Sequence, residues 1–143
     1  MTQVVLPGDT NHHGTVFGGK VMQWIDICGG VAAHRHAQSD VVTASMDELH
    51  FLAPARLGDI VVLRSSVNAV GRSSMEVGVK IWSESPETGE RRHTASAYVT
   101  FVSIDGKSRP REVPNLIPET PDERRRLAEG TKRLAERRLR RSR

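Results

Sequence analysis

The sequence has little cysteine and lacks the long apolar runs that membrane insertion and secretion require. Cys28 is the only cysteine among 143 residues, so no internal disulfide can form, and no second cysteine or histidine pair stands at zinc-ligand spacing. No apolar run approaches the roughly 18 residues of a membrane span, and residues 1–3 do not begin a signal peptide. These absences exclude a disulfide-stapled or zinc-built scaffold. They predict a soluble cytoplasmic protein without stable membrane insertion.

Aromatic residues are also scarce, at 4%, whereas hydrophobic residues make up 37% and charged residues 27%. The length fits one domain, and the apolar content suffices for one buried core. The net charge of +4 is concentrated at the end, because residues 122–143 hold ten Lys/Arg against four Asp/Glu and the other 121 residues hold eleven against thirteen. Since the body is slightly acidic and lacks aromatic residues interleaved with arginine, we do not expect nucleic acid as a partner.

The hydrophobic pattern predicts one long helix near the start of the chain. A short strand over Gln3–Leu6 is followed by a turn rich in glycine and proline. The helix is predicted over about Gly18–His36, because apolar residues recur there at steps of three and four, namely at Val21, Trp24, Ile25, Cys28 and Ala32. Gly29 and Gly30 in its middle predict that the helix backbone packs closely against a flat surface such as a sheet.

From residue 41 onward the hydrophobic period changes to two, which predicts consecutive strands joined by hairpin-sized turns. The predicted strands are Val41–Leu52, Ile60–Val70, Met75–Glu84 and His93–Ile104. The third run alternates cleanly, so we expect one face to be buried and the other, with Glu76, Lys80 and Glu84, to face solvent. In the last run the small Ala95 and Ala97 leave room for the helix.

The last part of the chain is predicted as a proline-rich irregular stretch followed by a helix. Prolines at positions 110, 114 and 118 exclude a regular element before residue 119, and Thr120, Pro121 and Glu123 then form a helix start with a capping box. The apolar stripe of this helix is narrow, so we expect it to pack lightly or on a neighbouring subunit; the stripe consists of Leu127, Thr131, Leu134 and Ala135. The chain is thus predicted as one α+β domain over residues 1–118 and a basic C-terminal helix or tail over 119–143.

The segment Pro7–Asp26 carries the most informative motif, with a D-x-N-x-x-G turn, a Gly-Gly helix start and an acidic residue inside the helix. In this order and spacing the chain resembles the acyl-CoA thioesterases of the hotdog superfamily, in particular the cytosolic long-chain acyl-CoA hydrolases. The resemblance extends to about residue 135 through Val42–Asp47, Ser73–Val77 and Val113–Glu123. It implies the hotdog fold, in which an antiparallel sheet wraps around one long central helix.

The resemblance also implies an activity, which is hydrolysis of a fatty acyl-CoA to a free fatty acid and CoASH. Such hydrolysis needs an activated water and a group that stabilises the developing oxyanion. Gly18 and Gly19 present unpaired N–H groups at the positive end of the helix, which suits an oxyanion hole. Asp26 is the candidate base or nucleophile, and the Asn11 amide can hold water or substrate. By resemblance, Asn11 and Asp26 fall on the two catalytic positions of the family.

The assembly and the cofactor requirement follow from the same resemblance. It implies that Asn11 of one protomer meets Asp26 of another across a dimer interface, so a dimer is the smallest active unit. We expect a hexamer built as a trimer of dimers. No metal and no redox cofactor are expected, because coenzyme A is itself part of the substrate and of the product.

Coenzyme A carries a 3′-phosphate and a diphosphate, so its site should offer basic groups together with hydroxyl and N–H donors. The predicted hairpin at Arg72, Ser73 and Ser74 has all three kinds of donor and resembles the family segment that borders the coenzyme A channel. Arg109 and Arg111, in the proline-rich stretch, are further candidates.

Three other interpretations compete with hydrolysis. The chain could bind acyl-CoA without catalysis and regulate a partner, or act as a hotdog dehydratase in which His13 works with Asp26. A metal site of Asp9, His12 and His13 is disfavoured, because adjacent histidines cannot easily face one ion. Asn11 could also serve only as a turn residue.

Overall fold

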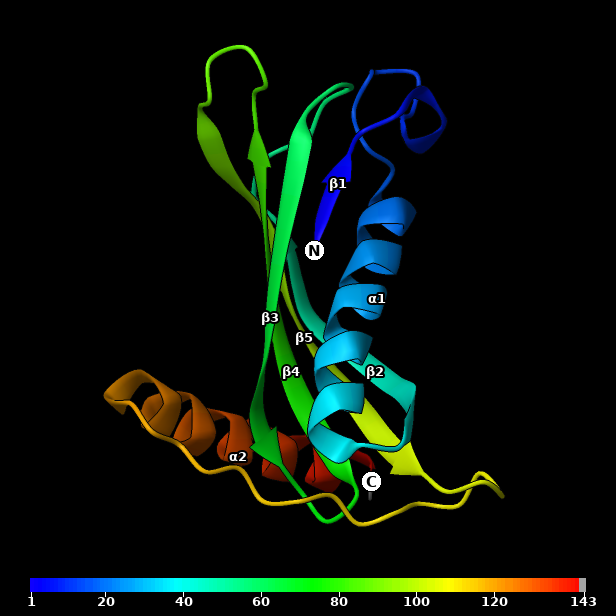
Figure 1. Cartoon of the computed structure of the whole chain (residues 1–143), viewed down its shortest axis with the longest axis vertical. Helices are drawn as coiled ribbons and strands as arrows, with labels where there is room; N and C mark the ends of the chain where they lie inside the picture. Colours follow the sequence, from blue (N-terminus) through cyan, green and yellow to red (C-terminus); the bar gives the residue numbers. More distant parts are fainter. Residues whose placement is uncertain (142–143) are drawn as a thin grey trace.

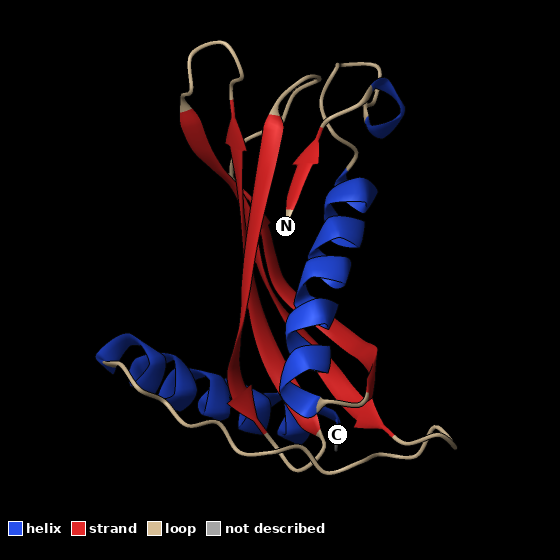
Figure 2. Ribbon diagram, in the orientation of Figure 1, coloured by secondary structure: helices blue, strands red, loops and turns tan. Residues whose placement is uncertain are grey.

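The structure is a computed structural model that describes residues 1–141, and it consists of a single sheet with a long helix on each face (Figures 1 and 2). In chain order the elements are β1 (Thr2–Val4), the short 3-10 helix η1 (Pro7–Asp9), α1 (Gly18–Ala37), β2 (Asp40–Phe51), β3 (Ile60–Val70), β4 (Ser74–Glu84), β5 (Arg91–Ile104) and α2 (Pro121–Arg141). None of the helices in this part of the chain is long and apolar enough to cross a membrane.

The five strands form one antiparallel sheet in the order β1-β3-β4-β5-β2. The β3–β4 and β4–β5 connections are hairpins, as the sequence predicts. The predicted hairpin between β2 and β3 is wrong, because β4 and β5 lie between these two strands, and the short β1 lies at the far edge beside β3. Within residues 1–141, β2 pairs only with β5, so the other edge of β2 carries unpaired backbone groups. The open edge thus lies on β2, the strand whose Thr43 contacts Asp26 of α1.

The core lies between α1 and the sheet, and the predicted helix is confirmed to within one residue at its end. The predicted apolar residues Val21, Trp24, Ile25 and Cys28 are buried there, whereas Ala33 is buried in place of Ala32. A Cβ atom built on Gly29 would lie 3.2 Å from the ring of Phe101 on β5, whereas one built on Gly30 would lie 3.7 Å from it. Gly29 therefore allows the close helix-to-sheet packing that the sequence predicts.

The five strands begin and end within two residues of their predicted bounds, including the short one at the N-terminus. There the predicted strand Gln3–Leu6 is shorter, because the backbone N–H of Leu6 donates to the Asp9 carboxylate, 3.0 Å away, and the chain turns into η1. The stretch after β5 has neither helix nor strand, as its prolines predict. It runs as an extended strap along the lower end of the sheet to α2 (Figure 1).

The start of α2 is confirmed, and the helix packs on its own sheet more closely than the sequence predicts, whereas its predicted contact with a neighbouring subunit stays a prediction. The N–H of Glu123 donates to the Thr120 hydroxyl at 3.1 Å, and the Glu123 carboxylate accepts from the N–H of Glu119 at 2.7 Å. From this cap α2 crosses the outer face of its own sheet, opposite α1 (Figure 1). It buries Gly130, Leu134 and Arg137, whereas Thr131 and Ala135 of the predicted stripe are exposed.

Glu76 on β4 is a second correction, because the strand alternation predicts that it faces solvent. Its side chain points to the outer face of the sheet as predicted, yet α2 covers it and leaves 0% of the residue exposed. Lys80 on the same face is exposed, in agreement with the prediction. The division of the chain at residue 118 stays a prediction, and residues 142 and 143 of the predicted tail lie outside the described residues.

Candidate active site

Asn11 stands in the tight loop between η1 and α1, where its side chain is held by its own neighbours. Its Oδ1 atom accepts from the backbone N–H of His13 at 2.9 Å and from that of Thr15 at 3.3 Å. Its Nδ2 atom lies 3.1 Å from the Thr15 hydroxyl oxygen. Asn11 therefore has the turn role that the sequence allows, and this turn fixes a half-buried amide just before the helix.

Gly18 and Gly19 form the open start of α1. The residue before them, Phe17, provides no side-chain cap, and no residue in the described part of the chain accepts a hydrogen bond from the N–H of either glycine. Both residues are exposed, and a Cβ placed on Gly19 would meet nothing within 4 Å. The ring of Phe51 on β2 lies 3.5 Å from such an atom on Gly18. Two N–H donors are thus available at the positive end of the helix dipole.

Asp26 lies on the side of α1 that faces β2. Its Oδ1 atom accepts a hydrogen bond of 2.6 Å from the hydroxyl group of Thr43. Both residues line an open cavity of about 410 Å³ between α1 and β2, together with Gly30, Val31 and Phe101. Asp26 is half-buried, so its carboxylate reaches both the protein and the cavity. One oxygen is held by Thr43, and the other remains available to water or substrate.

Thr43 is not identified as a site residue by the sequence alone, although its position in the strand pattern could have indicated it. In the ladder between β2 and β5, Val41 is opposite Ser103 and Thr43 is opposite Phe101, so both residues point toward α1. A hydroxyl group at a helix-facing strand position is unusual, because such positions are normally apolar. That pattern could have identified Thr43 as a partner for a polar group on the helix.

Within one chain, the structure does not bring the three candidate features together. Asp26 comes eight residues after Gly18, which is about 12 Å along the helix axis at 1.5 Å per residue. Among residues 1–141, the side chain of Asn11 hydrogen-bonds residues 13 and 15, and the side chain of Asp26 hydrogen-bonds Thr43. A carbonyl carbon at Asp26 therefore cannot reach the helix start of the same chain.

The candidate coenzyme A residues gather at one end of the sheet. Arg72 and Ser73 lie in the turn between β3 and β4, and Ser74 is the first residue of β4. The carbonyl oxygens of Arg72 and Ser73 accept from the backbone N–H groups of Val113 and Ser103, each at 2.8 Å. Arg109 follows the end of β5, where its carbonyl oxygen accepts from the N–H of Asp105 at 2.8 Å. Arg72, Arg109 and Arg111 are exposed.

The two histidines of the Asn11 loop are both exposed, with ring centroids 3.8 Å apart. Over residues 1–141, no group of three or more His, Cys, Asp or Glu side chains is placed to hold a metal ion. His13 belongs to the loop before α1, whereas Asp26 lies in the middle of that helix, so the pairing that a dehydratase would use is not formed within the chain.

The fold and the cavity define a hotdog protein, and comparison with known proteins gives the family. The sequence profile of the Thioesterase superfamily matches residues 13–90. An uncharacterized acyl-CoA thioester hydrolase of Bacillus subtilis, YkhA, is 48% identical over 122 residues, which cover 85% of this chain and 71% of that protein. The mouse cytosolic acyl coenzyme A thioester hydrolase is 34% identical over 91% of this chain, which spans only 35% of that protein's length.

Solved structures agree with this assignment. An apo-hexameric acyl-CoA thioesterase superimposes with a TM-score of 0.92 at 42% identity, covering 98% of this chain and 90% of that one. The acyl-CoA hydrolase of Staphylococcus aureus, solved with butyryl coenzyme A and coenzyme A, has a TM-score of 0.90 at 38% identity, covering 99% of this chain and 86% of that one. The chain belongs to the thioesterase superfamily, with the hotdog fold that the sequence predicts, and it is an acyl-CoA thioesterase.

Proposed function

We propose that this thioesterase hydrolyses fatty acyl-CoA in the cytoplasm, at a site that two copies of the chain build together. The reaction is RCO–S–CoA + H₂O → RCOO⁻ + CoASH + H⁺. The observation that carries the proposal is the Thr43–Asp26 hydrogen bond, because it places an oriented carboxylate at a cavity beside the open edge strand β2. Asp26 serves as general base or as nucleophile.

In the general-base form, the free oxygen of Asp26 takes a proton from water while that water attacks the thioester carbon. The hydroxyl group of Thr43 holds the other oxygen, so the carboxylate does not rotate away from the water. The carbonyl oxygen gains negative charge, which the N–H groups of Gly18 and Gly19 stabilise. The intermediate then collapses, the C–S bond breaks, and the proton passes to the leaving sulfur.

A second copy is needed because the two halves of the site are too far apart in one chain. The helix start at Gly18 lies about 12 Å from Asp26 along α1, and the Asn11 loop precedes that start. The surface beside β2 is suited to a partner, since the strand edge is open and exposed apolar side chains flank it: Phe17, Met22, Ile27, Val31, Val42 and Phe51. Pairing β2 with β2 of another copy brings Asn11 and Gly18 of each chain to Asp26 of the other.

Alanine variants of a relative support this assignment. Structures of the Staphylococcus aureus hydrolase include alanine variants at an asparagine, an aspartate and a threonine that are 15 and 17 residues apart in succession. Asn11, Asp26 and Thr43 have the same spacing in this chain. A hexameric relative supports a trimer of dimers as the complete assembly.

Coenzyme A is proposed to bind at the end of the sheet, on Arg72, Ser73, Ser74 and Arg109. These residues offer guanidinium and hydroxyl donors around one turn and one loop. The guanidinium group of Arg138 lies beside the same turn, because a Cβ atom on Gly71 would be 3.2 Å from its Nη2 atom. The chemistry uses no metal ion and no redox cofactor.

Thiol release from acyl-CoA esters, from acetyl to palmitoyl, tests this function. We expect wild type to release CoASH, and we expect Asn11→Ala and Asp26→Asn to lose roughly 10²- to 10⁴-fold in kcat, the range of an acid–base contribution. Asp40→Asn is the matched control, because Asp40 is an exposed carboxylate that lines the same cavity and should leave kcat unchanged.

Three other results would contradict the proposal in different ways. Full activity in both variants would show that neither Asn11 nor Asp26 takes part in catalysis. Binding of acyl-CoA without thiol release by wild type would indicate a regulatory binding protein. An enoyl product without free thiol would indicate a dehydratase.

A further inference from the structure

The outer face of the sheet holds a buried charge cluster that the proposed chemistry does not use. Glu76 on β4 has no exposed surface, and four donors surround its carboxylate. Arg133 of α2 donates to it through Nε at 2.9 Å and Nη2 at 2.7 Å, Arg137 of α2 through Nη1 at 2.8 Å, and Asn68 of β3 through Nδ2 at 3.3 Å. A fully buried carboxylate is thus the anchor on which α2 is fixed.

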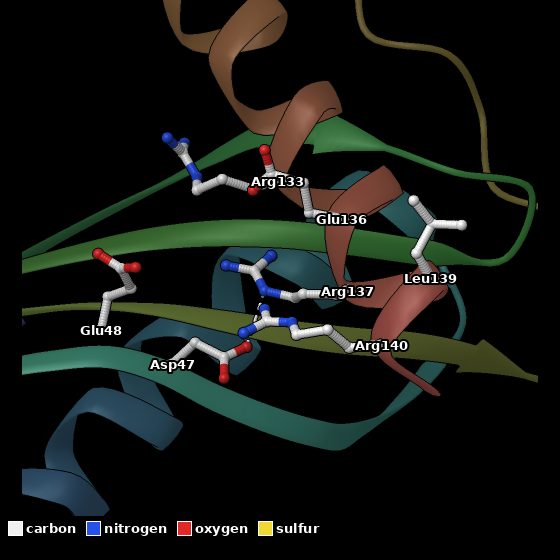
Figure 3. A pocket seen from close by; sticks show the side chains of 7 residues that line it. All are labelled: Asp47, Glu48, Arg133, Glu136, Arg137, Leu139 and Arg140. Carbon is white, nitrogen blue, oxygen red and sulfur yellow. Dashed lines mark ion pairs between the residues drawn. The ribbon is translucent and has the colours of Figure 1, made fainter. Parts of the chain in front are cut away.

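Arg137 has a second role, because it also reaches the edge strand β2. Its Nε atom lies 2.7 Å from Oδ2 of Asp47, at an angle too oblique for a directed hydrogen bond, so the contact is an ion pair (Figure 3). The Arg137 side chain is only 9% exposed and that of Asp47 is 32% exposed. One guanidinium group therefore ties β2 to β4 across the intervening strand β5.

The Arg137–Asp47 ion pair contacts β2 where the pairing of that strand is least regular. The pairing of β2 with β5 shifts register between Thr43 and Ser45 and again between Asp47 and His50. Glu48, next to Asp47, has a φ of 54°, which is the left-handed region. Because the regular ladder is interrupted on both sides of Asp47, the backbone hydrogen bonds alone hold this part of β2 weakly.

We propose that α2 is a positioning element for hydrolysis, in which Arg137, anchored on Glu76, holds Asp47 and thereby keeps Thr43 in place against Asp26. The inference rests on the proposed function of Asp26. Thr43 precedes the first register shift and its hydroxyl group bonds Asp26 at 2.6 Å, so a small displacement of β2 lengthens that bond. Asp47 and Arg137 are positioning residues, since neither lines the cavity beside Asp26.

The test replaces Asp47 by asparagine, which removes the charge and keeps the shape. We expect Asp47→Asn to lower kcat about tenfold with less than about a twofold change in KM, because displaced groups slow the chemical step more than they weaken substrate binding. Glu48→Gln is the matched control. Glu48 is the neighbouring acid on β2 and forms an ion pair with His50 at 4.0 Å. Its replacement should leave kcat unchanged.

A double-mutant cycle separates positioning from general destabilisation. If Asp47 acts through Thr43, then Asp47→Asn causes no further loss of kcat in a Thr43→Ala background. An equal tenfold loss in that background, or full activity of the single variant, would overturn the inference. Should Asp47→Asn not fold, Arg137→Lys replaces it in the same cycle, since lysine keeps the charge but cannot hold Glu76 and Asp47 together.

Hydrogen exchange distinguishes failure of this inference from failure of the proposed function. We expect the backbone amides of residues 44–48 to exchange faster in Asp47→Asn than in wild type, whatever the activity of the protein. Wild type without thiol release would contradict the proposed function alone. If wild type is active and hydrogen exchange in Asp47→Asn is unchanged, the Arg137–Asp47 ion pair does not hold this part of β2 in place.

Discussion

The ion pairs of Glu76 illustrate how single side chains decide the arrangement of this protein. A lone buried carboxylate would be strongly unfavourable, and here two guanidinium groups form charge-assisted hydrogen bonds with it. Asp47, which also pairs with Arg137, balances the second positive charge. The hydrogen bond to Glu76 raises the pKa of the Arg133 guanidinium above its ordinary value, and partial burial opposes this effect. Arg133 also stacks over the ring of Tyr98, with its Cζ atom 3.9 Å from the ring centroid.

The raised pKa of Arg133 gives a prediction for alkaline stability. A group whose pKa is higher in the folded state stabilises the protein fully at pH values below its unfolded-state pKa. This stabilisation is lost as the pH rises through the folded-state pKa. For arginine this loss lies at a higher pH than for lysine, whose unperturbed pKa is about 10.4. We therefore expect Arg133→Lys to lose stability between about pH 10 and 11.5, relative to wild type.

Urea unfolding at pH 8 and at pH 11, at one protomer concentration, measures this difference. The control is Arg124→Lys, an exposed arginine on the same helix, which should follow wild type at both pH values. Parallel behaviour of Arg133→Lys and wild type would show that the charge of residue 133 contributes nothing to folding.

At the scale of elements, α2 depends on a glycine for its close approach to the sheet. A Cβ atom on Gly130 would lie 2.9 Å from Cβ of Ala69 and 3.1 Å from Oε1 of Glu76. Glycine in a helix is unfavourable by about 1 kcal/mol relative to alanine. We expect the ion pairs that this close contact permits to offset that cost.

Gly130→Ala tests this docking. We expect the substitution to lower the free energy of unfolding by about 1–3 kcal/mol, because the added methyl group pushes α2 away from Ala69 and Glu76. Thr131→Ala, at the exposed neighbouring position, should leave stability unchanged or raise it by a few tenths of a kcal/mol. Equal or higher stability of Gly130→Ala in chemical denaturation would mean that α2 does not pack as described.

The same elements show how far the sequence determines the fold. The period of α1, the glycine pair that faces Phe101 and the alternation of β4 are local patterns, and they predict the inner layer correctly. Glu76 was predicted as exposed, because alternation identifies the two faces of a strand but not whether a distant helix covers the outer one. The buried face of α2 was not predictable from its apolar residues alone, because Arg133 and Arg137 on that face form ion pairs with the buried Glu76.

The candidate site was predictable to the extent that it depends on local motifs. Asn11, Gly18, Gly19 and Asp26 lie within one short segment, so their order could be read directly. Thr43 contacts Asp26 only because β2 folds back along α1, which is a tertiary contact between residues 17 positions apart. In the proposed site, Asn11 and Asp26 come from different chains, and contacts within one chain do not determine that pairing.

At the scale of the whole molecule, the exposed surface of one chain is the strongest indication of assembly. The open edge of β2 and the large exposed side chains beside it would be unfavourable in water, and pairing two copies covers both. A two-fold interface gives each dimer two equivalent sites. The activity, the open edge and the 12 Å gap along α1 then have one common explanation.

Complementation between two inactive variants tests this central claim most directly. Asn11→Ala and Asp26→Asn are unfolded together, refolded at a 1:1 ratio, and assayed for thiol release. Random pairing makes half of the dimers mixed, and each mixed dimer has one site with both residues intact, so we predict about a quarter of the wild-type activity. Each variant refolded alone should stay inactive. A mixture as inactive as the separate variants, with dimers intact by light scattering, would contradict a site shared between two chains.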